Sequence, residues 1–240
     1  MRSVLAAVLL PVVALLLIGP YTFLPPVIEY AVARDVQSRL GLDEAPEVDL
    51  KSDPPLRMVA GEVSGGTIRL EDAGLGGVRT ETATIDLDPF DVNVIESIGR
   101  GSMVAGEPLS GGLRVEVPEA EVARLIGDGA DVPVRDVDVT ASGMEVQSEA
   151  TVFGTTLPVS APGTLTLSGQ NFVFEPRNLT AAGVSVPQEL ADAVLAGTEF
   201  DYPIKGLPYG SRITSVEPTD GLLVLTGRVP RIPLGVYPGG

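Results

Sequence analysis

The fold of this chain is indicated by a stretch near its middle, LRVEVPEAEVARLIG at residues 113–127. In its first five residues apolar and charged side chains alternate, the period of a half-buried antiparallel strand. Pro118 then suits the first position of a helix, and acidic residues follow where they favour the positive end of the helix dipole. Gly127 is expected to end the helix. The stretch predicts a strand that leads directly into a short helix.

The same two-residue alternation recurs along most of the chain, with Val and Thr enriched in the apolar positions. It is found in Thr67–Leu70, Asp136–Val139, Met144–Val146, Thr164–Leu167, Phe172–Phe174 and Ile213–Val216. Asp220-Gly221 is a hairpin signal just after the last of these. The pattern therefore predicts a β-dominated domain whose sheets have one apolar and one solvated face.

Two further helices are expected. One begins at Pro25-Pro26 and ends at Gly41, with Ile28, Val32, Val36 and Leu40 spaced every four residues. The other, VPQELADAVLAG at residues 186–197, resembles the strand end and helix that start at Val117, 69 residues earlier. Two alternatives explain that similarity: duplication of a strand–helix unit, or independent selection of residues that favour the start and the end of a helix.

The N-terminus carries an apolar segment. Ser3–Ile28 contains no charged residue over 26 positions, long enough for a transmembrane helix. Arg2 precedes it and acidic residues follow, which places the N-terminus in the cytoplasm and the rest outside. We expect a signal-anchor over residues 1–28, a domain over 29–228 and a Pro/Gly-rich tail over 229–240. A cleaved signal peptide with secretion is the alternative.

Composition excludes many chemistries. The chain has no His, Cys or Trp and a formal charge of −16. Catalytic triads, thiolate nucleophiles and His- or Cys-ligated metals are therefore excluded, and binding to nucleic acid is disfavoured. Paired carboxylates, as in glycosidases, are the remaining enzymatic option, but 32 acidic residues make such pairs inevitable. We therefore expect that the protein is not an enzyme and binds no cofactor.

Two groups of acidic residues are candidates for calcium sites, since calcium prefers clustered carboxylates. The groups are Asp86, Asp88 and Asp91, and Asp131, Asp136 and Asp138. The first lacks the glycine and terminal glutamate of an EF-hand loop, and we interpret both as solvated strand ends. No metal site is expected.

The last quarter of the chain reads FDYPIKGLPYGSRITSV at residues 200–216, followed by Asp220-Gly221-Leu222. It resembles the C-terminal signature of the LmeA-like phospholipid-binding family of actinobacterial cell-envelope proteins. The resemblance extends to Leu40-Gly41-Leu42, Pro46-Glu47-Val48 and the glycines around Ser64, so it covers about residues 27–227. It implies an α+β, tubular lipid-binding-like fold, in which a strongly curved antiparallel sheet wraps around a long helix behind the transmembrane segment.

This resemblance implies a membrane-anchored, extracytoplasmic phospholipid carrier or sensor in envelope lipid biogenesis. Its partners would be phospholipid and, through residues 3–28, the plasma membrane. Groove-lining candidates are Ile28, Val32, Val36, Leu190, Val194 and Leu195. Headgroup candidates are Tyr202, Lys205, Tyr209 and Arg212. The alternative is a structural or partner-binding envelope domain with a filled core, because protein interiors normally close to crystal-like density.

Overall fold

The computed structural model describes residues 26, 28–54, 56–75, 77–100, 103–129, 134–152, 155–181, 183–186, 200–203 and 207–232. Lys205, the helix predicted after Val186 and nearly all of the predicted anchor therefore lie outside the described residues. Within these residues, no helix is both long and apolar enough to cross a membrane.

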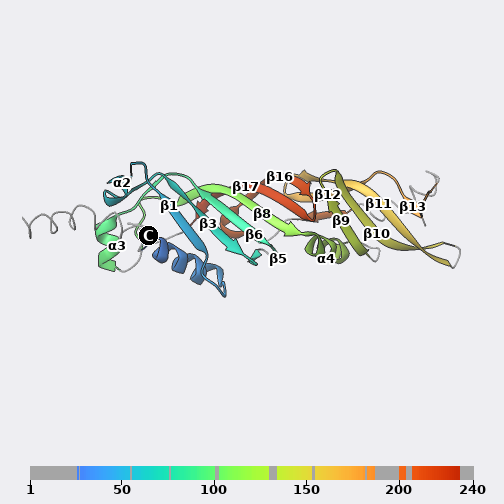
Figure 1. Ribbon diagram of the computed structural model, residues 1–240, viewed down its shortest axis with the longest axis horizontal. Coiled ribbons are helices and arrows are strands. Elements are labelled where there is room, and N and C mark those ends of the chain that lie inside the picture. Colours follow the sequence, from blue (N-terminus) through green and yellow to red (C-terminus); the bar gives the residue numbers. More distant parts are fainter. Residues whose placement is uncertain are drawn as a thin grey trace, which may run out of the picture. The chain divides into compact units, whose positions relative to one another are not determined.

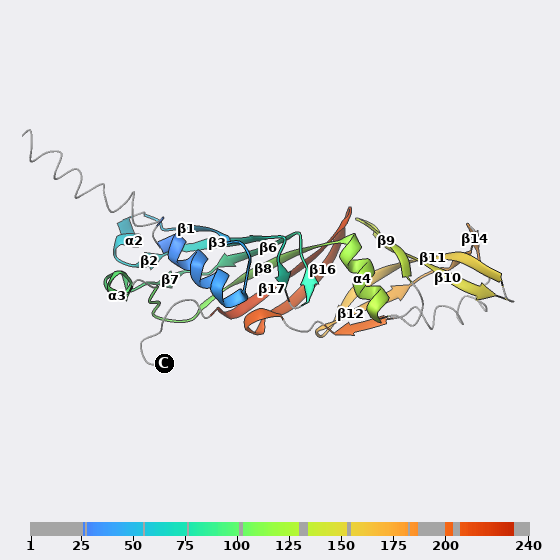
Figure 2. The same cartoon turned by 90° about the horizontal axis from the view of Figure 1, so that it is seen from below.

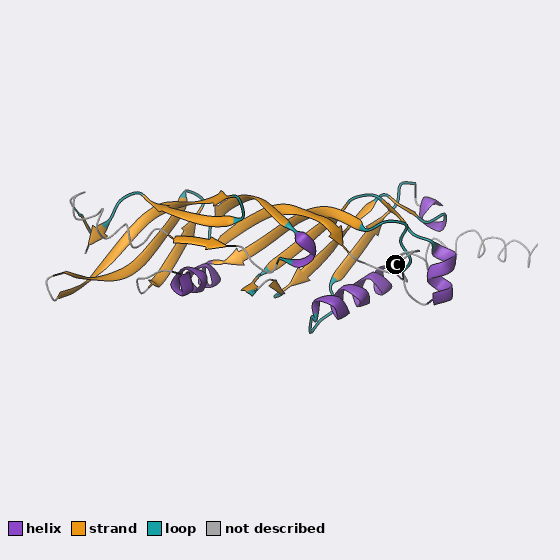
Figure 3. Cartoon of the chain, turned by 180° about the vertical axis from the view of Figure 1, so that it is seen from behind, coloured by secondary structure: helices purple, strands orange, loops and turns teal. Residues whose placement is uncertain are grey.

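The chain divides into two compact units, and strands predominate over helices in the described residues (Figures 1 and 3). Unit 1 comprises residues 1–70, 84–112 and 230–240, and unit 2 comprises residues 71–83 and 113–229. The strands form open antiparallel sheets, so the fold is mostly β with a few helices.

Unit 1 contains a helix over residues 28–40 and the neighbouring strands β1, β3, β6 and the first residues of β8, in that order. The bounds are β1 Glu47–Lys51, α2 Leu56–Val59, β2 Glu62–Val63, β3 Gly65–Glu71, β6 Thr82–Leu87, β7 Phe90–Asp91, α3 Val94–Arg100 and β8 Leu109–Pro118. Strands β2 and β7 form a separate small ladder. The helix lies against the sheet (Figure 2), and α2 and α3 lie at one end of the unit.

Unit 2 contains residues 113–118 of β8, with β17 and then β16 as the next strands, together with a second sheet. The second sheet has the order β14, β13, β11, β10, β9, with β12 paired to β11 and to β15. The bounds are β4 Gly74–Leu75, β5 Val78–Arg79, α4 Glu119–Gly129, β9 Val134–Thr140, β10 Gly143–Val152, β11 Thr155–Ser168, β12 Asn171–Pro176, β13 Thr180–Ala181, β14 Val184–Ser185, β15 Phe200–Pro203, a 3-10 turn η1 Pro208–Gly210, β16 Arg212–Thr219 and β17 Leu222–Ile232.

The alternation patterns are confirmed as strands, each inside one of the elements above. The strand–helix stretch over 113–127 is β8 followed by α4, although α4 runs to Gly129, two residues past the predicted end at Gly127. The hairpin predicted at Asp220-Gly221 joins β16 to β17. The helix predicted to end at Gly41 does so, and Gly41 adopts a φ of 64°, the left-handed conformation of a helix C-cap.

Candidate functional site

The helix over residues 28–40 presents its apolar stripe to the interior of unit 1. Val32 is 0% exposed, and Ile28 and Val36 are buried as well. The Glu29 side chain fixes the helix beside the sheet, because its Oε1 accepts a hydrogen bond of 3.1 Å from the backbone N–H of Leu50 in β1. The three groove-lining candidates on this helix therefore lie in the unit's apolar interior.

The sheet of unit 1 contributes the opposite wall of that interior (Figure 2). Along β8 every second residue is buried, and the buried residues at the ends of β3 and β6 follow the same alternation. The buried aliphatic side chains are Leu50, Ile68, Leu70, Ile85, Leu87 and Leu109. An interior built from aliphatic groups on both walls provides dispersion contacts and excludes water. A molecule bound there needs no hydrogen-bonding groups.

Glycines bring neighbouring strands of unit 1 unusually close. A Cβ atom on Gly66 of β3 would lie 2.6 Å from the backbone oxygen of Asp49 in β1. A Cβ on Gly111 of β8 would collide with the backbone oxygen of Asp86 in β6. Gly in a strand typically marks a bend or a close backbone approach, and such positions allow a sheet to coil.

Unit 2 has its own apolar sheet face. Val137, Val146 and Ala161 lie side by side on β9, β10 and β11, and all three are buried. Phe174 of β12 packs over Gly163, where any Cβ would lie 2.5 Å from the ring. Helix α4 packs against β9 and β15 and buries Val122, Leu125 and Ile126. Close packing of this kind is typical of a filled protein core.

The motif over residues 200–216 forms the edge strand β15, the turn η1 and the start of β16. Tyr202 lies opposite Phe172 in the β12–β15 ladder. Tyr209 adopts a φ of 57° within η1, and its hydroxyl oxygen is buried. Arg212 is exposed at the first position of β16. The side chains of Tyr209 and Arg212 thus differ in exposure, and the headgroup role of these residues stays a prediction.

Arg228 was not among the headgroup candidates, yet β17 places it directly opposite Arg212. Both arginines are exposed. The hairpin signal at Asp220-Gly221 indicated that the next strand returns beside Arg212, but a bulge between Ile213 and Ser215 determines which residue lies opposite it. The other groove-lining candidates, Leu190, Val194 and Leu195, lie outside the described residues.

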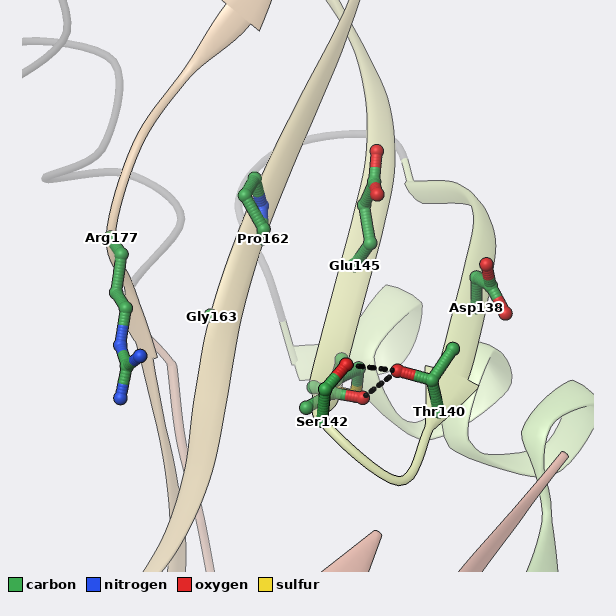
Figure 4. Close-up of a pocket in the computed structure, with 9 residues that line it drawn as sticks. Asp138, Thr140, Ser142, Glu145, Pro162, Gly163 and Arg177 are labelled. Carbon is green, nitrogen blue, oxygen red and sulfur yellow. Dashed lines mark hydrogen bonds between the residues drawn. The ribbon is translucent and has the colours of Figure 1, made fainter. Parts of the chain in front are cut away.

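A polar depression of about 170 Å³ lies over β9, β10 and β11 (Figure 4). Asp138 and Glu145 stand opposite each other in the ladder, and the hydroxyls of Thr140 and Ser142 share a hydrogen bond of 2.9 Å. Small-molecule sites typically measure about 300–1,000 Å³ and are mostly apolar. This depression is therefore too small and too polar to hold acyl chains.

Glu121 of α4 is the one described carboxylate with a clear pKa shift. Arg124 donates two hydrogen bonds to it, of 2.6 and 3.0 Å, and the backbone N–H of Arg79 donates a third of 3.0 Å. The Arg124 hydrogen bonds hold the pKa of Glu121 below its usual value, although burial opposes them. Since Arg124 also donates to the carbonyl of Gly77, the cluster ties α4 to the β4–β5 hairpin.

Two residues of the acidic groups considered as calcium sites accept local hydrogen bonds. Asp86 accepts a hydrogen bond of 3.3 Å from the Thr67 hydroxyl, and Asp88 accepts one of 2.6 Å from the Ser110 hydroxyl. In the part of the chain that the structure describes, no three acidic residues are grouped so that they could hold a metal ion. Asp131 lies outside that part.

The family model described as LmeA-like phospholipid-binding matches residues 21–228, which is most of the chain. The chain therefore belongs to this family, as the resemblance in its last quarter indicated. Neither the comparison with curated proteins nor that with solved structures gave a match.

Proposed function

We propose that this member of the LmeA-like phospholipid-binding family carries or senses phospholipid in the cell envelope without catalysing a reaction. The observation that carries the proposal is the family match over residues 21–228. The family supports lipid binding; the carrier or sensor role and the link to envelope lipid biogenesis are our extension of it.

The aliphatic interior of unit 1 supports this function. Each methylene group moved from water into an apolar environment contributes about 0.8 kcal/mol, so acyl chains gain affinity without polar partners. The stripe formed by Ile28, Val32 and Val36 and the buried face of the sheet are the walls that such chains would contact. We propose that the chains enter between these walls, displacing their mutual packing.

The finer architecture is part of the proposal. In a tubular lipid-binding-like fold the sheet curves strongly around a long helix. The close strand approaches at Gly66 and Gly111 support such curvature, because they remove the side chains that would hold the strands apart. The helix over residues 28–40 would be the one that the sheet surrounds.

We also propose that residues 3–28 anchor the chain in the plasma membrane, with the N-terminus in the cytoplasm and the domain outside. The uncharged run, Arg2 before it and the acidic residues after it support this orientation. The excess of acidic residues repels the phosphate backbone, so nucleic acid is not among the partners proposed.

A second function, a structural or partner-binding envelope domain, is favoured by one observation. Large side chains such as Phe174 and Ile68 are almost completely inaccessible, and Phe174 fills the space over Gly163. A core that is filled in this way in both units would leave no room for acyl chains.

A photoactivatable phospholipid distinguishes the two functions. The full chain is reconstituted in nanodiscs that contain the probe, and the cross-linked peptides are mapped by mass spectrometry. Adducts within residues 28–40 and on the buried faces of β3 and β6 are expected for a carrier or sensor. Adducts confined to residues 1–25 would mean that the chain contacts lipid only through its anchor, and the lipid-binding function would then be withdrawn.

A further inference from the structure

Helix α3 is held firmly in unit 1 although it has only seven residues. Asn93 caps it, because the Asn93 Oδ1 accepts a hydrogen bond of 3.1 Å from the backbone N–H of Glu96. The Ser97 hydroxyl donates a hydrogen bond of 2.6 Å to the Asn93 carbonyl and accepts one of 2.9 Å from the N–H of Val104. Val104 itself is buried. The helix is therefore a fixed part of the surface.

On this fixed helix Ile95 is 87% exposed. The other large exposed apolar side chains in the described residues are Tyr30, at 62%, and Val184, at 70%. A single exposed aliphatic residue needs no explanation by itself. The exposure of Ile95 is informative because α3 lies near a second exposed apolar side chain, that of Tyr30.

Tyr30 lies near the start of the helix over residues 28–40, two positions after the uncharged run Ser3–Ile28 ends. The guanidinium carbon of Arg34 lies 5.6 Å from the centroid of the Tyr30 ring, a cation–π arrangement. Tyrosine is enriched where proteins cross the membrane–water interface, and arginine can extend its charge to that interface.

The start of this helix and α3 lie at the same end of unit 1, together with α2, in all three views (Figures 1–3). The apolar run therefore enters the described part of the chain at the end that carries Ile95. If the run spans the bilayer, this end is the part of unit 1 nearest the membrane surface.

We infer that this end of unit 1, with Tyr30, Arg34 and Ile95 as its contact residues, docks on the headgroup region of the bilayer. The inference rests on the membrane anchor in the proposed function. Docking would hold the aliphatic interior of unit 1 beside the membrane whose lipids it is proposed to take up.

The charges at this end indicate that the contact is apolar rather than electrostatic. Arg100 pairs with Glu96 at 2.7 Å, and Arg57 pairs with Glu62 at 3.6 Å. Because these cations are locally neutralised and Arg34 adds only a single charge beside the Tyr30 ring, anionic lipids should add little attraction, and salt should have little effect. The expected contact is therefore independent of membrane charge.

The absence of cysteine allows a clean test. Ile95→Cys and Tyr30→Cys are made singly in the full chain and labelled with an environment-sensitive fluorophore. Val184→Cys, at an apolar position in unit 2 whose exposure lies between those of Tyr30 and Ile95, is the matched control. The labelled chains are reconstituted in phosphatidylcholine vesicles with and without phosphatidylglycerol, and flotation measures anchoring.

The label at position 95 is expected to have blue-shifted emission and to be quenched by lipids with a doxyl group near the headgroup. Quenching by doxyl groups near the chain end should be weaker, since interfacial elements sit only about 5–10 Å into the headgroup and acyl boundary. The label at 184 should behave as in water, and phosphatidylglycerol should change neither result.

Solvent-like emission at 95 in chains that float, or equal quenching at 95 and 184, would overturn docking. Chains that do not float would overturn the anchor and, with it, docking. Failure of lipid binding inside unit 1 is separately visible, because photo-cross-linking would then give no interior adducts while quenching at 95 persists.

Discussion

Replacing Glu121 by Gln tests whether the cluster around Arg124 stabilises unit 2. The Glu121 side chain is only 6% exposed and accepts three hydrogen bonds. Gln has nearly the same shape but no charge, and its amide group cannot accept at both positions. The substitution thus removes the charge-assisted bonds while it leaves the packing of α4 almost unchanged.

The expected loss follows from the geometry. A hydrogen bond to a charged group contributes about 1.5–3 kcal/mol. The lower end applies, because the Arg124 side chain is 46% exposed, can be rehydrated and keeps its 2.7 Å bond to Asp128. We expect Glu121→Gln to lower the free energy of unfolding by about 1.5 kcal/mol, or the melting temperature by about 3–6 °C.

The effect should depend on pH with a defined sign. The pKa of Glu121 is lowered in the folded state, so its stabilisation is complete above the unfolded value of 4.5 and is lost as the pH falls through the folded pKa. The stability difference between wild type and Glu121→Gln should therefore be largest near pH 7 and shrink below about pH 4.5.

The assay is thermal unfolding of the full chain in mild detergent from pH 3 to pH 8, with hydrogen exchange of α4 as a local readout. Asp128→Asn is the matched control, since it removes an exposed carboxylate, 62% accessible, from the same arginine. It should cost no more than about 0.5 kcal/mol. Equal effects of both substitutions, or a Glu121→Gln effect that does not change with pH, would refute the reasoning.

Four further outcomes are expected. A reporter fused after Gly240 should be active outside the cytoplasm, whereas an intact mass starting near residue 20 would replace the anchor with a cleaved signal. EDTA should leave the melting temperature unchanged; a large loss restored by calcium would mean that the acidic groups bind metal. Replacing Lys205 and Arg212 together by Gln should reduce bound phospholipid or change headgroup preference without changing the melting temperature; no change in either lipid measurement would remove both residues from the site. Gly66→Ala should destabilise the chain by about 1–3 kcal/mol, because its Cβ would meet the Asp49 carbonyl, while Gly74→Ala, which meets nothing within 4 Å, should not; equal melting temperatures would contradict the close strand approach.

The strands and the observed helices were predictable because local patterns determine them. The alternation in 113–117 places Val115 inward and Arg114 outward in β8, as the period of two requires. The spacing of Val32 and Val36 likewise identifies the buried side of the helix over residues 28–40. In these elements local propensity and tertiary burial agree.

The pairing of Arg212 with Arg228 was not predictable by simple counting. From the turn at Asp220-Gly221, Thr219 pairs with Leu222 and Ser215 with Thr226, so uninterrupted pairing would bring Val229 opposite Arg212. A bulge between Ile213 and Ser215 shifts the register by one residue. A bulge is one extra residue on one strand, and the residue types of this hairpin do not predict its position.

Glu121 was missed for a different reason. Acidic residues in the first turn of α4 were explained by the helix dipole, which acts on exposed side chains too. Burial of Glu121 depends on the β4–β5 hairpin, whose backbone donates from Arg79 and whose Gly77 carbonyl engages Arg124. The partner hairpin lies more than 40 residues away in the chain, so no local pattern around Glu121 indicates its burial.

The distribution of charge bears on which part of a lipid this chain would select. Several cations of the described residues are engaged by neighbouring carboxylates, as in Arg39–Asp35, Lys51–Asp49 and Arg135–Glu149, and the whole chain keeps a charge of −16. An anionic headgroup therefore meets a repulsive long-range field and only local attraction at points such as Arg212. The aliphatic walls, by contrast, favour every methylene equally. Under the proposed function, selection should consequently follow acyl-chain length and shape more than headgroup charge.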